Sequence, residues 1–413
     1  MKRLSILTAT LLLLGCNTQE TKLPTTSEDG IAEIDQFFQG AVDRHEIPGM
    51  VAIVANKDQI LYHGAFGKRD VENDAEMQPD AIFDIASMTK PITSVAVMIL
   101  YEEGRLDLDD PISNYIPSLK DREVIAQLNE TDSTYTTKPA EQEITIRHLL
   151  THTSGLGYDF SNHTLNQLAR KAGMGLLSVG PTDFPLLHEP GSRWTYGMST
   201  RVLGTLIEEL TGQPLQDFFK TRIFDPLGID DTFYAVPEEK YSRFVTLHLR
   251  QDGVLVEQPK PAAQDQSVFI AGDGGLRSTA EDYITFLQML LNLGTLGEAK
   301  ILSAAYIDMM TQNQIGTLVV EEQPGALPAW SQAFPLGANR DKFGLGFQLT
   351  ASDGAKQRAK GSYSWSGLFN THFWVDPQNE IAAVILMQVL PFYDTACIRT
   401  LQGFEERIYG NLR

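Results

Sequence analysis

Ser87 and Lys90 are the two residues best suited to do chemistry together, because they form the chain's only Ser-x-x-Lys tetrad. The tetrad opens an apolar segment of helical periodicity that runs to about Tyr101 and stops before Gly104. Residues three apart share one face of a helix. A lysine whose pKa is lowered by burial or by a neighbouring cation can take the proton of such a serine, which activates the serine as a nucleophile.

The expected position of Ser87 at a helix N-terminus would help the same chemistry. Free backbone N–H groups and the positive end of the helix dipole lie there, and both favour negative charge. At average composition, however, a chain of this length contains roughly one such tetrad by chance. A coincidental tetrad is therefore the alternative, and the remaining sequence must decide between the two.

Strand patterns at both ends of the chain and helical patterns in its middle must position this pair. Polar residues 121–143 are predicted to be an irregular insertion. Helices are expected at 31–42, 92–103, 144–151, 200–212, 214–220 and 400–409, and strands at 50–56, 59–64, 344–350, 363–366, 371–375 and 381–387. This order predicts an α/β fold of the α+β type: one antiparallel sheet from both chain ends, flanked by helices, with a mainly helical subdomain inserted over roughly 90–260.

Composition sets the class of protein. The 413 residues can bury a large core, and the 42% hydrophobic and 21% charged contents are ordinary for a globular protein. The formal net charge is −20. This balance argues against nucleic acid as a partner, because phosphate binding needs clustered lysine and arginine. It also disfavours electrostatic docking on an anionic membrane surface.

The N-terminus predicts export and lipid attachment. Residues 1–15 combine a basic head with a short apolar run, as secretory signals do. Leu14-Gly15-Cys16 resembles a bacterial lipoprotein processing site, at which Cys16 would be lipidated and bind the membrane; a plain signal peptide is the alternative. Residues 16–29 would form a tether, with 30–413 as the folded domain. With Asn17 next, we expect a cell-envelope protein on the periplasmic face of the outer membrane.

Cys397 is the chain's second and last cysteine. Lipidation of Cys16 would leave Cys397 without a cysteine partner, so we expect no disulfide within the mature chain. It falls in a late helical stretch, and we predict that it is a small core residue.

Several motifs, in a fixed order, support the catalytic interpretation of the tetrad. Together they resemble the serine hydrolase family of class C β-lactamases, penicillin-binding DD-peptidases and related carboxylesterases, over about residues 31–405. The matching pieces are Ser87-Met88-Thr89-Lys90, Leu106-Asp107-Leu108-Asp109-Asp110-Pro111, Arg147 through Leu156, Pro190-Gly191 through Tyr196, Gly272-Asp273-Gly274-Gly275-Leu276 and Trp365-Ser366-Gly367. The resemblance implies a β-lactamase/transpeptidase-like fold and no metal or organic cofactor.

The resemblance also implies catalytic roles. Ser87 would attack a carbonyl carbon and form an acyl-enzyme, with Lys90 and Tyr196 sharing the role of general base. Tyr196 stands where the family has the tyrosine of its Tyr-x-Asn motif, and a lysine ammonium nearby would favour a lowered tyrosine pKa. The backbone N–H groups of Ser87 and Leu368 would form the oxyanion hole.

Two departures from the family pattern indicate the substrate class. Trp365, followed by Ser366 and Gly367 in the expected substrate-binding strand, replaces the lysine of the Lys-Thr-Gly motif that binds a substrate carboxylate in lactamases and DD-peptidases. Met198 replaces the asparagine of Tyr-x-Asn. Both changes make the expected site more apolar, and the family's esterases commonly carry a Trp-x-Gly form. Arg277 is a possible substitute cation, which keeps the lactamase alternative open.

Two other patterns resemble functional motifs but do not match them fully. His148 and His152 are four apart, the spacing of a zinc pair on a helix, but Leu149 replaces the glutamate of His-Glu-x-x-His. We therefore expect no metal site there. Phe160-Ser161-Asn162 looks like a second Tyr-x-Asn motif but has no hydroxyl at its first position.

The sequence as a whole predicts a lipid-anchored serine hydrolase of the bacterial envelope that acts on small-molecule esters. Within the enzymes, a DD-peptidase or a weak β-lactamase is the alternative. Outside them, the alternative is a catalytically silent protein that binds peptidoglycan or a partner in the same cleft.

Overall fold

The computed structural model describes residues 25–129, 131–175 and 178–412. The predicted signal peptide (1–15), Cys16 and most of the predicted tether lie outside the described residues. The first helix, α1 (Glu28–Asp43), begins inside the range predicted to be tether. Ser27 caps it by accepting a hydrogen bond from the Gly30 N–H at 3.1 Å, and two acidic residues in the first turn complement the helix dipole.

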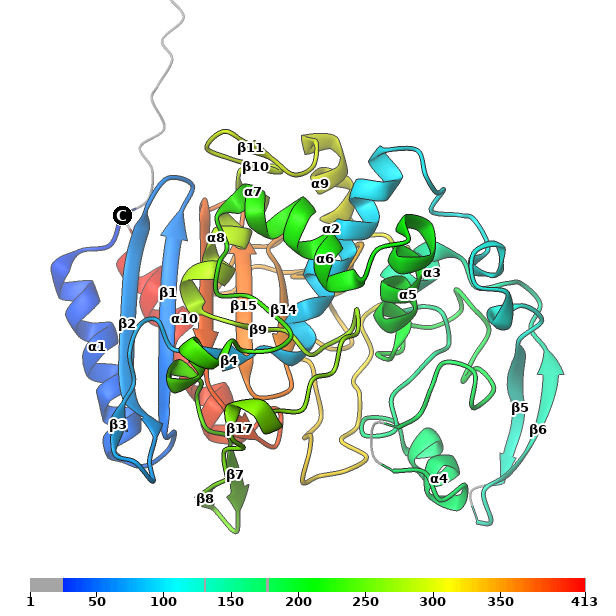
Figure 1. Ribbon diagram of the computed structural model, residues 1–413, viewed down its shortest axis with the longest axis horizontal. Helices are drawn as coiled ribbons and strands as arrows, with labels where there is room; N and C mark the ends of the chain where they lie inside the picture. The colour runs from blue at the N-terminus through cyan, green and yellow to red at the C-terminus, as the bar shows by residue number, and fades with distance from the viewer. Residues whose placement is uncertain (1–24, 130, 176–177, 413) are drawn as a thin grey trace, which may run out of the picture.

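One large antiparallel sheet combines both ends of the chain (Figure 1), as predicted. N-terminal β1 pairs directly with C-terminal β16, with Val51 opposite Leu386. In spatial order the strands are β12 (Lys342–Phe343), β13 (Gln348–Leu349), β14 (Tyr363–Gly367), β15 (Thr371–Asp376), β16 (Ile381–Leu386), β1 (Gly49–Asn56), β2 (Ile60–Asp70) and β3 (Ala75–Glu76). The predicted strand 344–350 is wrong in detail, since a turn at Gly346 separates β12 from β13.

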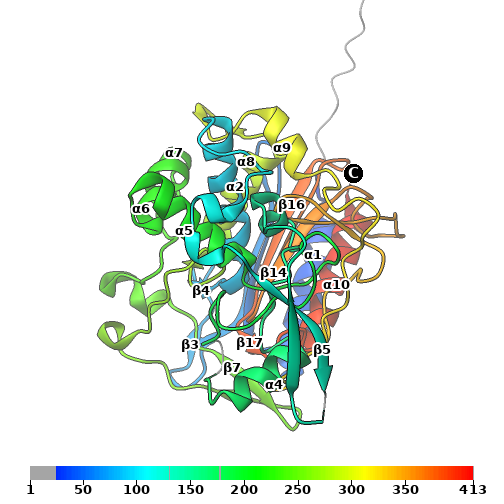
Figure 2. The same ribbon diagram turned by 90° about the vertical axis from the view of Figure 1, so that its right-hand side faces the viewer.

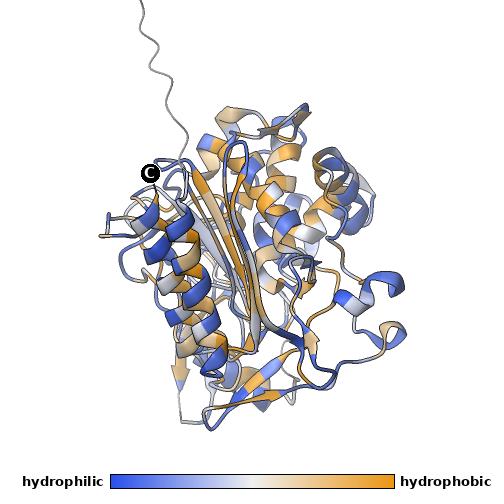
Figure 3. Ribbon diagram, turned by 90° about the vertical axis from the view of Figure 1, so that its left-hand side faces the viewer, coloured by the Kyte–Doolittle hydropathy of each residue, from blue (hydrophilic) through white to orange (hydrophobic). Residues whose placement is uncertain are grey.

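Helices cover both faces of this sheet, and for this reason every residue of β1 is buried. Met50, Ala52 and Val54 belong to a core shared with α1 and α10 (Thr395–Asn411), because alternate residues of a strand face opposite sides. The residues between them face a larger core shared with α2 (Thr89–Glu102) and α8 (Ala280–Leu291). In Figure 3, α1 and α10 turn their apolar sides to the sheet and their polar sides outward.

Cys397 lies in α10 and is fully buried among the apolar side chains of the α1–α10 side, which confirms its predicted place in the core. The two chain ends meet there: α1 packs against α10, and a β-bridge joins Thr26 to Leu412.

The middle of the chain supplies most of the remaining helices. They are α3 (Ile146–Leu150), α4 (His163–Lys171), α5 (Ser199–Thr211), α6 (Leu215–Phe219), α7 (Asp225–Leu227) and α9 (Ala304–Met310). Shorter turns are η1 (Ala86–Met88), η2 (Ile112–Asn114), η3 (Pro117–Leu119), the π-helical η4 (Lys220–Phe224), η5 (Glu238–Arg243) and η6 (Ala263–Asp265). The helix α2 is buried on all sides from Thr89 to Leu100, which places it at the centre of the larger core.

Residues 121–143 are not irregular, which corrects the prediction. They form a hairpin of β5 (Glu123–Asn129) and β6 (Thr134–Pro139), at the end of the molecule opposite α1 (Figures 1 and 2). Val124 is the one residue of the two strands that is buried. With both faces open to solvent, the hairpin lacks the alternation of apolar and polar residues by which strands are recognised in a sequence.

Small sheets also join loop segments. β4 (Phe83–Asp84) pairs with β9 (Arg277–Ser278), and β17 (Val389–Leu390), β7 (His248–Gln251) and β8 (Val254–Glu257) form a second sheet. A third pairs β10 (Thr295–Leu296) with β11 (Ala299–Lys300). Through β4 and β9, the Gly272–Leu276 segment is brought beside the turn that carries Ser87.

Gly367 lets β14 approach that turn closely. A Cβ atom at this position would lie 2.2 Å from the Ile85 carbonyl oxygen and 2.3 Å from Thr371 Oγ1, far inside van der Waals contact. We expect Gly367→Ala to lower the free energy of unfolding by about 1–3 kcal/mol, because one of these neighbours must shift. Urea unfolding of both proteins measures the difference.

Gly410→Ala is the matched control, because its Cβ would meet nothing closer than 3.9 Å and lies near the end of α10. It should leave stability unchanged or slightly raised, as alanine favours helix over glycine. Equal stability of the Gly367→Ala and Gly410→Ala variants would contradict the close packing of β14 on the Ser87 turn.

Candidate active site

Ser87 lies in the η1 turn that leads into α2. The turn is fixed from both sides: the Ile85 N–H donates to the Leu276 carbonyl at 3.0 Å, and β14 packs against the Ile85 carbonyl through Gly367. Ala86 has a positive φ of 43°, a strained value for an alanine. Such strain persists only where the surroundings enforce it, so the position of Ser87 is set by β4, β9 and β14 together.

Three predicted side chains meet at one oxygen atom. Lys90 Nζ lies 3.0 Å from Ser87 Oγ, and the Tyr196 hydroxyl donates a hydrogen bond to the same Oγ at 2.7 Å. The structure thus brings together Ser87, Lys90 and Tyr196, although Tyr196 is more than a hundred residues away in the chain. A nucleophile in contact with two proton-exchanging groups is the arrangement that covalent catalysis requires.

Lys90 is placed so that its amine is largely deprived of solvent. It is 1% exposed, and besides Ser87 its one hydrogen-bond partner in the described chain is the Asp273 carbonyl, at 2.7 Å. The rings of Tyr158 and Tyr196 face its Nζ at 5.2 and 4.9 Å from their centroids. Burial lowers the pKa of Lys90 to about 7 although the Asp273 carboxylate opposes the shift. A substantial fraction is therefore neutral near pH 7 and can accept a proton.

A buried ionic group behind Lys90, which sequence analysis did not assign, fixes the Asp273 carbonyl. The Asp273 carboxylate accepts hydrogen bonds from the Tyr158 hydroxyl at 2.5 Å and from Arg201 Nε at 3.1 and 3.2 Å. The Arg201 charge also lowers the pKa of Lys90. Asp273 was visible only as part of a family motif, and Tyr158 and Arg201 carry no local signal, because the group forms from three separate segments.

The pKa expected for Tyr196 is wrong in direction. Burial raises its pKa above the usual value, and Asp273 contributes in the same sense. The lysine cannot impose the predicted lowering, because the hydroxyl lies in a nearly solvent-free aromatic environment where the phenolate is disfavoured. Tyr196 is therefore a neutral hydrogen-bond donor at pH 7, and Lys90 is the stronger candidate for the base.

The predicted oxyanion hole would consist of the backbone N–H groups of Ser87 and Leu368. Neither the Ser87 nor the Leu368 backbone N–H donates to another group within the described part of the chain. Both residues line the cavity beside Ser87 Oγ. Two free N–H groups beside a nucleophile can stabilise the oxyanion of a tetrahedral intermediate.

The cavity at Ser87 is small and mostly apolar. Its volume is about 10 Å³, which is room for about one water molecule. Besides Ser87, Tyr196 and Leu368 it is lined by Trp365, Ser366, Phe160, Phe334, Pro335 and Phe392. The last four were not predicted as site residues, because isolated phenylalanines and prolines in loops are common and carry no distinctive pattern.

The predicted substrate-binding residues divide into two groups. Trp365 packs against Tyr196 with ring centroids 5.1 Å apart, and Ser366 lines the cavity. Gly367 contributes its close approach to the Ser87 turn. Met198, by contrast, is buried at the N-terminus of α5 and is not among the residues that line the Ser87 cavity.

His148 and His152 do not form a metal-binding pair. α3 ends at Leu150, so the helical spacing does not hold. His148 Nδ1 accepts a hydrogen bond from the Thr145 N–H in a capping box, whereas His152 is buried beside the Trp194, Tyr196 and Trp365 rings. In the three described segments, no group of three or more His, Cys, Asp or Glu side chains is placed to hold a metal ion.

Comparisons with known proteins concern the family and the fold of the chain. A sequence profile of the family described as Beta-lactamase matches residues 34–404. An uncharacterized protein of Mycobacterium tuberculosis is 32% identical over 362 residues, 84% of this chain and 86% of that protein. The esterase EstB of Burkholderia gladioli is 29% identical, covering 86% of this chain and 89% of its own. A mutant of simvastatin synthase (LovD) from Aspergillus terreus has a similar structure, with a TM-score of 0.78, 27% identity and coverage of 92% and 99%. The family resemblance and the fold predicted from the sequence are thereby confirmed.

The pKa of Lys90 predicts a pH profile. If the neutral amine takes the proton of Ser87, acylation by a p-nitrophenyl ester should rise about tenfold per pH unit below pH 7 and level off above it, because only deprotonated Lys90 is competent. Stopped-flow release of p-nitrophenol measures this rate.

Tyr196→Phe provides the comparison, since it keeps the ring and removes the hydroxyl. It should lower the plateau and leave the inflection near pH 7, whereas Lys90→Ala should remove the inflection. A wild-type rate that is constant from about pH 6 to pH 9 would rule out Lys90 as the base.

Proposed function

Because the chain belongs to the β-lactamase family, we propose that it is a serine hydrolase that cleaves small carboxylic esters through an acyl-enzyme on Ser87. One observation carries the proposal: Ser87 Oγ lies within hydrogen-bond distance of both Lys90 and Tyr196, at a cavity with largely aromatic and apolar walls. The similarity to esterase EstB supports the choice of an ester as substrate.

Acylation follows from the positions of these groups. Ser87 Oγ attacks the ester carbonyl carbon as its proton passes to the neutral amine of Lys90, 3.0 Å away. The carbonyl oxygen becomes an oxyanion that the Ser87 and Leu368 N–H groups stabilise. When the ester C–O bond breaks, the Tyr196 hydroxyl donates a proton to the leaving alkoxide and regains one from the Lys90 ammonium.

Deacylation uses the same groups in reverse. A water molecule attacks the carbonyl carbon of acyl-Ser87 and gives its proton to Lys90 through Tyr196. Ser87 Oγ leaves and is reprotonated, which releases a carboxylic acid and restores the enzyme. Removing one oxyanion-hole donor from such a site typically slows it about a hundredfold or more.

The charges around the site favour an ester over a β-lactam. Trp365 occupies the position of the lysine that would pair with a carboxylate, and its indole cannot make an ion pair. Arg277, the substitute cation suggested by the sequence, is 8% exposed, and its guanidinium donates to the backbone carbonyls of Tyr234 and Ser267. It is therefore already occupied and is not a ready partner for a substrate carboxylate.

We expect a fluorophosphonate probe to label the wild-type protein and not the Ser87→Ala variant, because the probe reacts with an activated serine. We further expect p-nitrophenyl acetate and butyrate to be hydrolysed at least about tenfold faster, by kcat/KM, than nitrocefin or a D-Ala-D-Ala peptide is turned over, because Trp365 removes the carboxylate partner.

The outcomes separate the alternatives. Absence of Ser87-dependent labelling would favour a silent binding protein and contradict the hydrolase. Faster turnover of nitrocefin or of the peptide than of esters would instead favour a β-lactamase or a DD-peptidase, respectively.

The proposal also includes attachment to a membrane through Cys16. It is supported by the Leu14-Gly15-Cys16 sequence alone, which lies outside the described residues. In the described part of the chain, none of the helices has both the length and the apolar character needed to cross a bilayer.

The full-length protein expressed in a Gram-negative host should partition into the detergent phase of Triton X-114, because several acyl chains on one cysteine hold a protein firmly at a membrane. The Cys16→Ala variant should not carry the lipid and should lose incorporation of an alkyne-labelled fatty acid. Incorporation that is equal in both proteins would refute lipidation at Cys16.

A further inference from the structure

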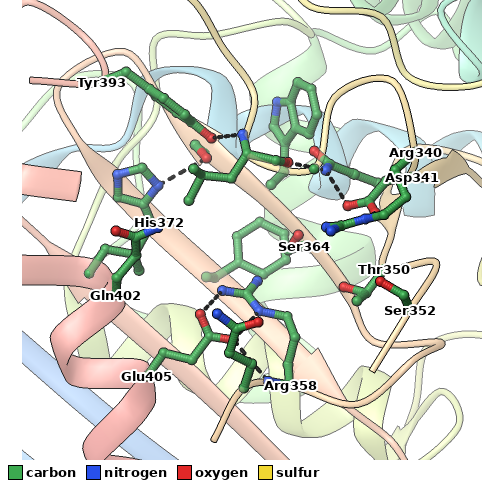
Figure 4. A pocket seen from close by; sticks show the side chains of 18 of the residues that line it. Arg340, Asp341, Thr350, Ser352, Arg358, Ser364, His372, Tyr393, Gln402 and Glu405 are labelled. Carbon is green, nitrogen blue, oxygen red and sulfur yellow. Dashed lines mark hydrogen bonds and ion pairs between the residues drawn. The ribbon is translucent and has the colours of Figure 1, made fainter. Parts of the chain in front are cut away.

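The cavity at Ser87 holds only about one water molecule, so it cannot enclose the acyl chain of an ester. A larger cavity of about 320 Å³ lies between β14, β15 and α10 (Figure 4). It is on the α10 side of the sheet, whereas Trp365 and α2 belong to the core on the other side. The Ser87 turn itself is partly exposed at Ala86 and Ser87. In this conformation an acyl chain on Ser87 therefore lies on the surface beside that turn.

Three consecutive apolar side chains are exposed just before the Gly272–Leu276 segment. Val268, Phe269 and Ile270 are 45%, 48% and 46% exposed. Single exposed apolar residues are common on proteins, but contiguous ones mark surfaces that bind a ligand, a membrane or another protein. We call these three residues the apolar lip.

The backbone of the apolar lip is held in place although its side chains are exposed. The buried guanidinium of Arg277 donates a hydrogen bond to the Ser267 carbonyl at 2.8 Å. The Phe269 carbonyl oxygen lies 1.8 Å from the position that a Cβ atom would take at Gly275, so only glycine allows this approach. The apolar lip is thus a preformed surface, which lowers the entropic cost of binding a ligand there.

The ring of Phe269 is attached to the segment that holds the catalytic lysine. The Arg201 guanidinium lies 5.2 Å from the centroid of this ring, within the range of a cation–π contact. Arg201 also forms an ion pair with Asp273 at 3.1 Å, and the Asp273 carbonyl accepts a hydrogen bond from Lys90. These contacts place the ring at the edge of the active site.

Gly274 leaves a space between this ring and the Ser87 turn. A Cβ atom at Gly274 would lie 3.9 Å from Phe269 Cε1 and 4.0 Å from the Ala86 carbonyl carbon, and it would meet nothing closer in the described chain. Because both atoms lie within 4.0 Å of one point, they are at most about 8 Å apart. The Ala86 carbonyl carbon is bonded to the Ser87 nitrogen, an expected oxyanion-hole donor, so the ring is close to the reacting atoms.

The mechanism leaves this direction to the acyl chain. The ester carbonyl oxygen points to the Ser87 and Leu368 N–H groups, and the alcohol leaves toward Tyr196, which protonates it. Tyr196 packs against Trp365 and Phe334, and neither of these belongs to the apolar lip. A hexanoyl chain extends roughly 6 Å from its carbonyl carbon and makes contact across a further 4 Å, so it can reach the Phe269 ring.

We propose that the apolar lip binds the acyl chain of the substrate, and that the substrates are esters of apolar acids with about six or more carbons. The inference rests on the proposed function, and it adds the substrate class. Val268 and Ile270 extend the apolar surface on either side of Phe269 in the chain. Binding of the chain there draws on contacts remote from the carbonyl, which can be used to lower the barrier of acylation.

The test compares two series of esters with the purified protein. The acyl series is p-nitrophenyl acetate, butyrate and hexanoate, followed by release of p-nitrophenol. The alcohol series is ethyl, butyl and hexyl acetate, followed by release of acid in a pH-stat. We expect kcat/KM to rise at least about tenfold from acetate to hexanoate in the acyl series, because each methylene group that leaves water adds binding energy. The alcohol series should change much less.

Phe269→Ala should lower the hexanoate-to-acetate ratio of kcat/KM at least about fivefold, and Phe269→Leu, which keeps an apolar side chain, should retain most of the ratio. Ile60→Ala is the control, because it removes an apolar side chain of similar exposure, 44%, at the start of β2. It should leave the ratio unchanged. Since the ratio is measured within each variant, partial loss of folded protein does not alter it.

Four results would overturn the proposal in distinguishable ways. A flat acyl series for the wild-type protein would refute an acyl site at the apolar lip while ester hydrolysis itself would stand. If, in addition, the wild-type protein bound phosphatidylcholine vesicles and Phe269→Ala did not, the apolar lip would be a membrane contact. A rise confined to the alcohol series, or one that Phe269→Ala leaves intact, would contradict the assignment of the acyl chain to Phe269. Absence of p-nitrophenol release from every ester would refute the esterase function itself.

Discussion

The burial of Lys90 is the constraint on which the rest of the site depends. An ammonium group 1% exposed to solvent is costly, since neither the Asp273 carbonyl nor two ring faces replace its full hydration. The neutral amine avoids this cost, so the same burial that destabilises the cation produces a base near pH 7. The Asp273 carboxylate would restore the cation if it stood alone, and its contacts with Arg201 and Tyr158 limit that effect.

The fold maintains this arrangement by joining distant segments at one turn. The sheet needs both chain ends, because β1 pairs with β16, and it presents β14 to the Ser87 turn. Gly367 permits the contact, and the pairing of β4 with β9 holds the Asp273 segment on the other side. Ser87 therefore lies between β14 and the buried helix α2, and contacts from both the large sheet and the β4–β9 pair fix its position.

The sequence could predict residues that are related by helical spacing or by an ordered set of family motifs. It could not predict contacts between segments that are far apart in the chain. Ser87 and Lys90 are one helical turn apart, and Tyr196 and Trp365 could be assigned from the order of family motifs. The Tyr158–Asp273–Arg201 group could not, because its members meet only in the folded chain. The direction of the Tyr196 pKa shift depends on burial, which no motif reports. The β5–β6 hairpin was missed because its exposed strands lack a buried face. Met198 was assigned to substrate binding by analogy with the family's asparagine, and it does not line the Ser87 cavity.

An apolar acyl site beside a base created by burial requires a covalent intermediate on Ser87 in each catalytic cycle. The most direct measurement is peptide mapping by mass spectrometry after rapid acid quench of the enzyme with p-nitrophenyl acetate. We expect one acetyl group on the Ser87 hydroxyl and none in the Ser87→Ala variant. Acetylation of Lys90 or Tyr196 in place of Ser87, or p-nitrophenol release without any acetylated peptide, would contradict it.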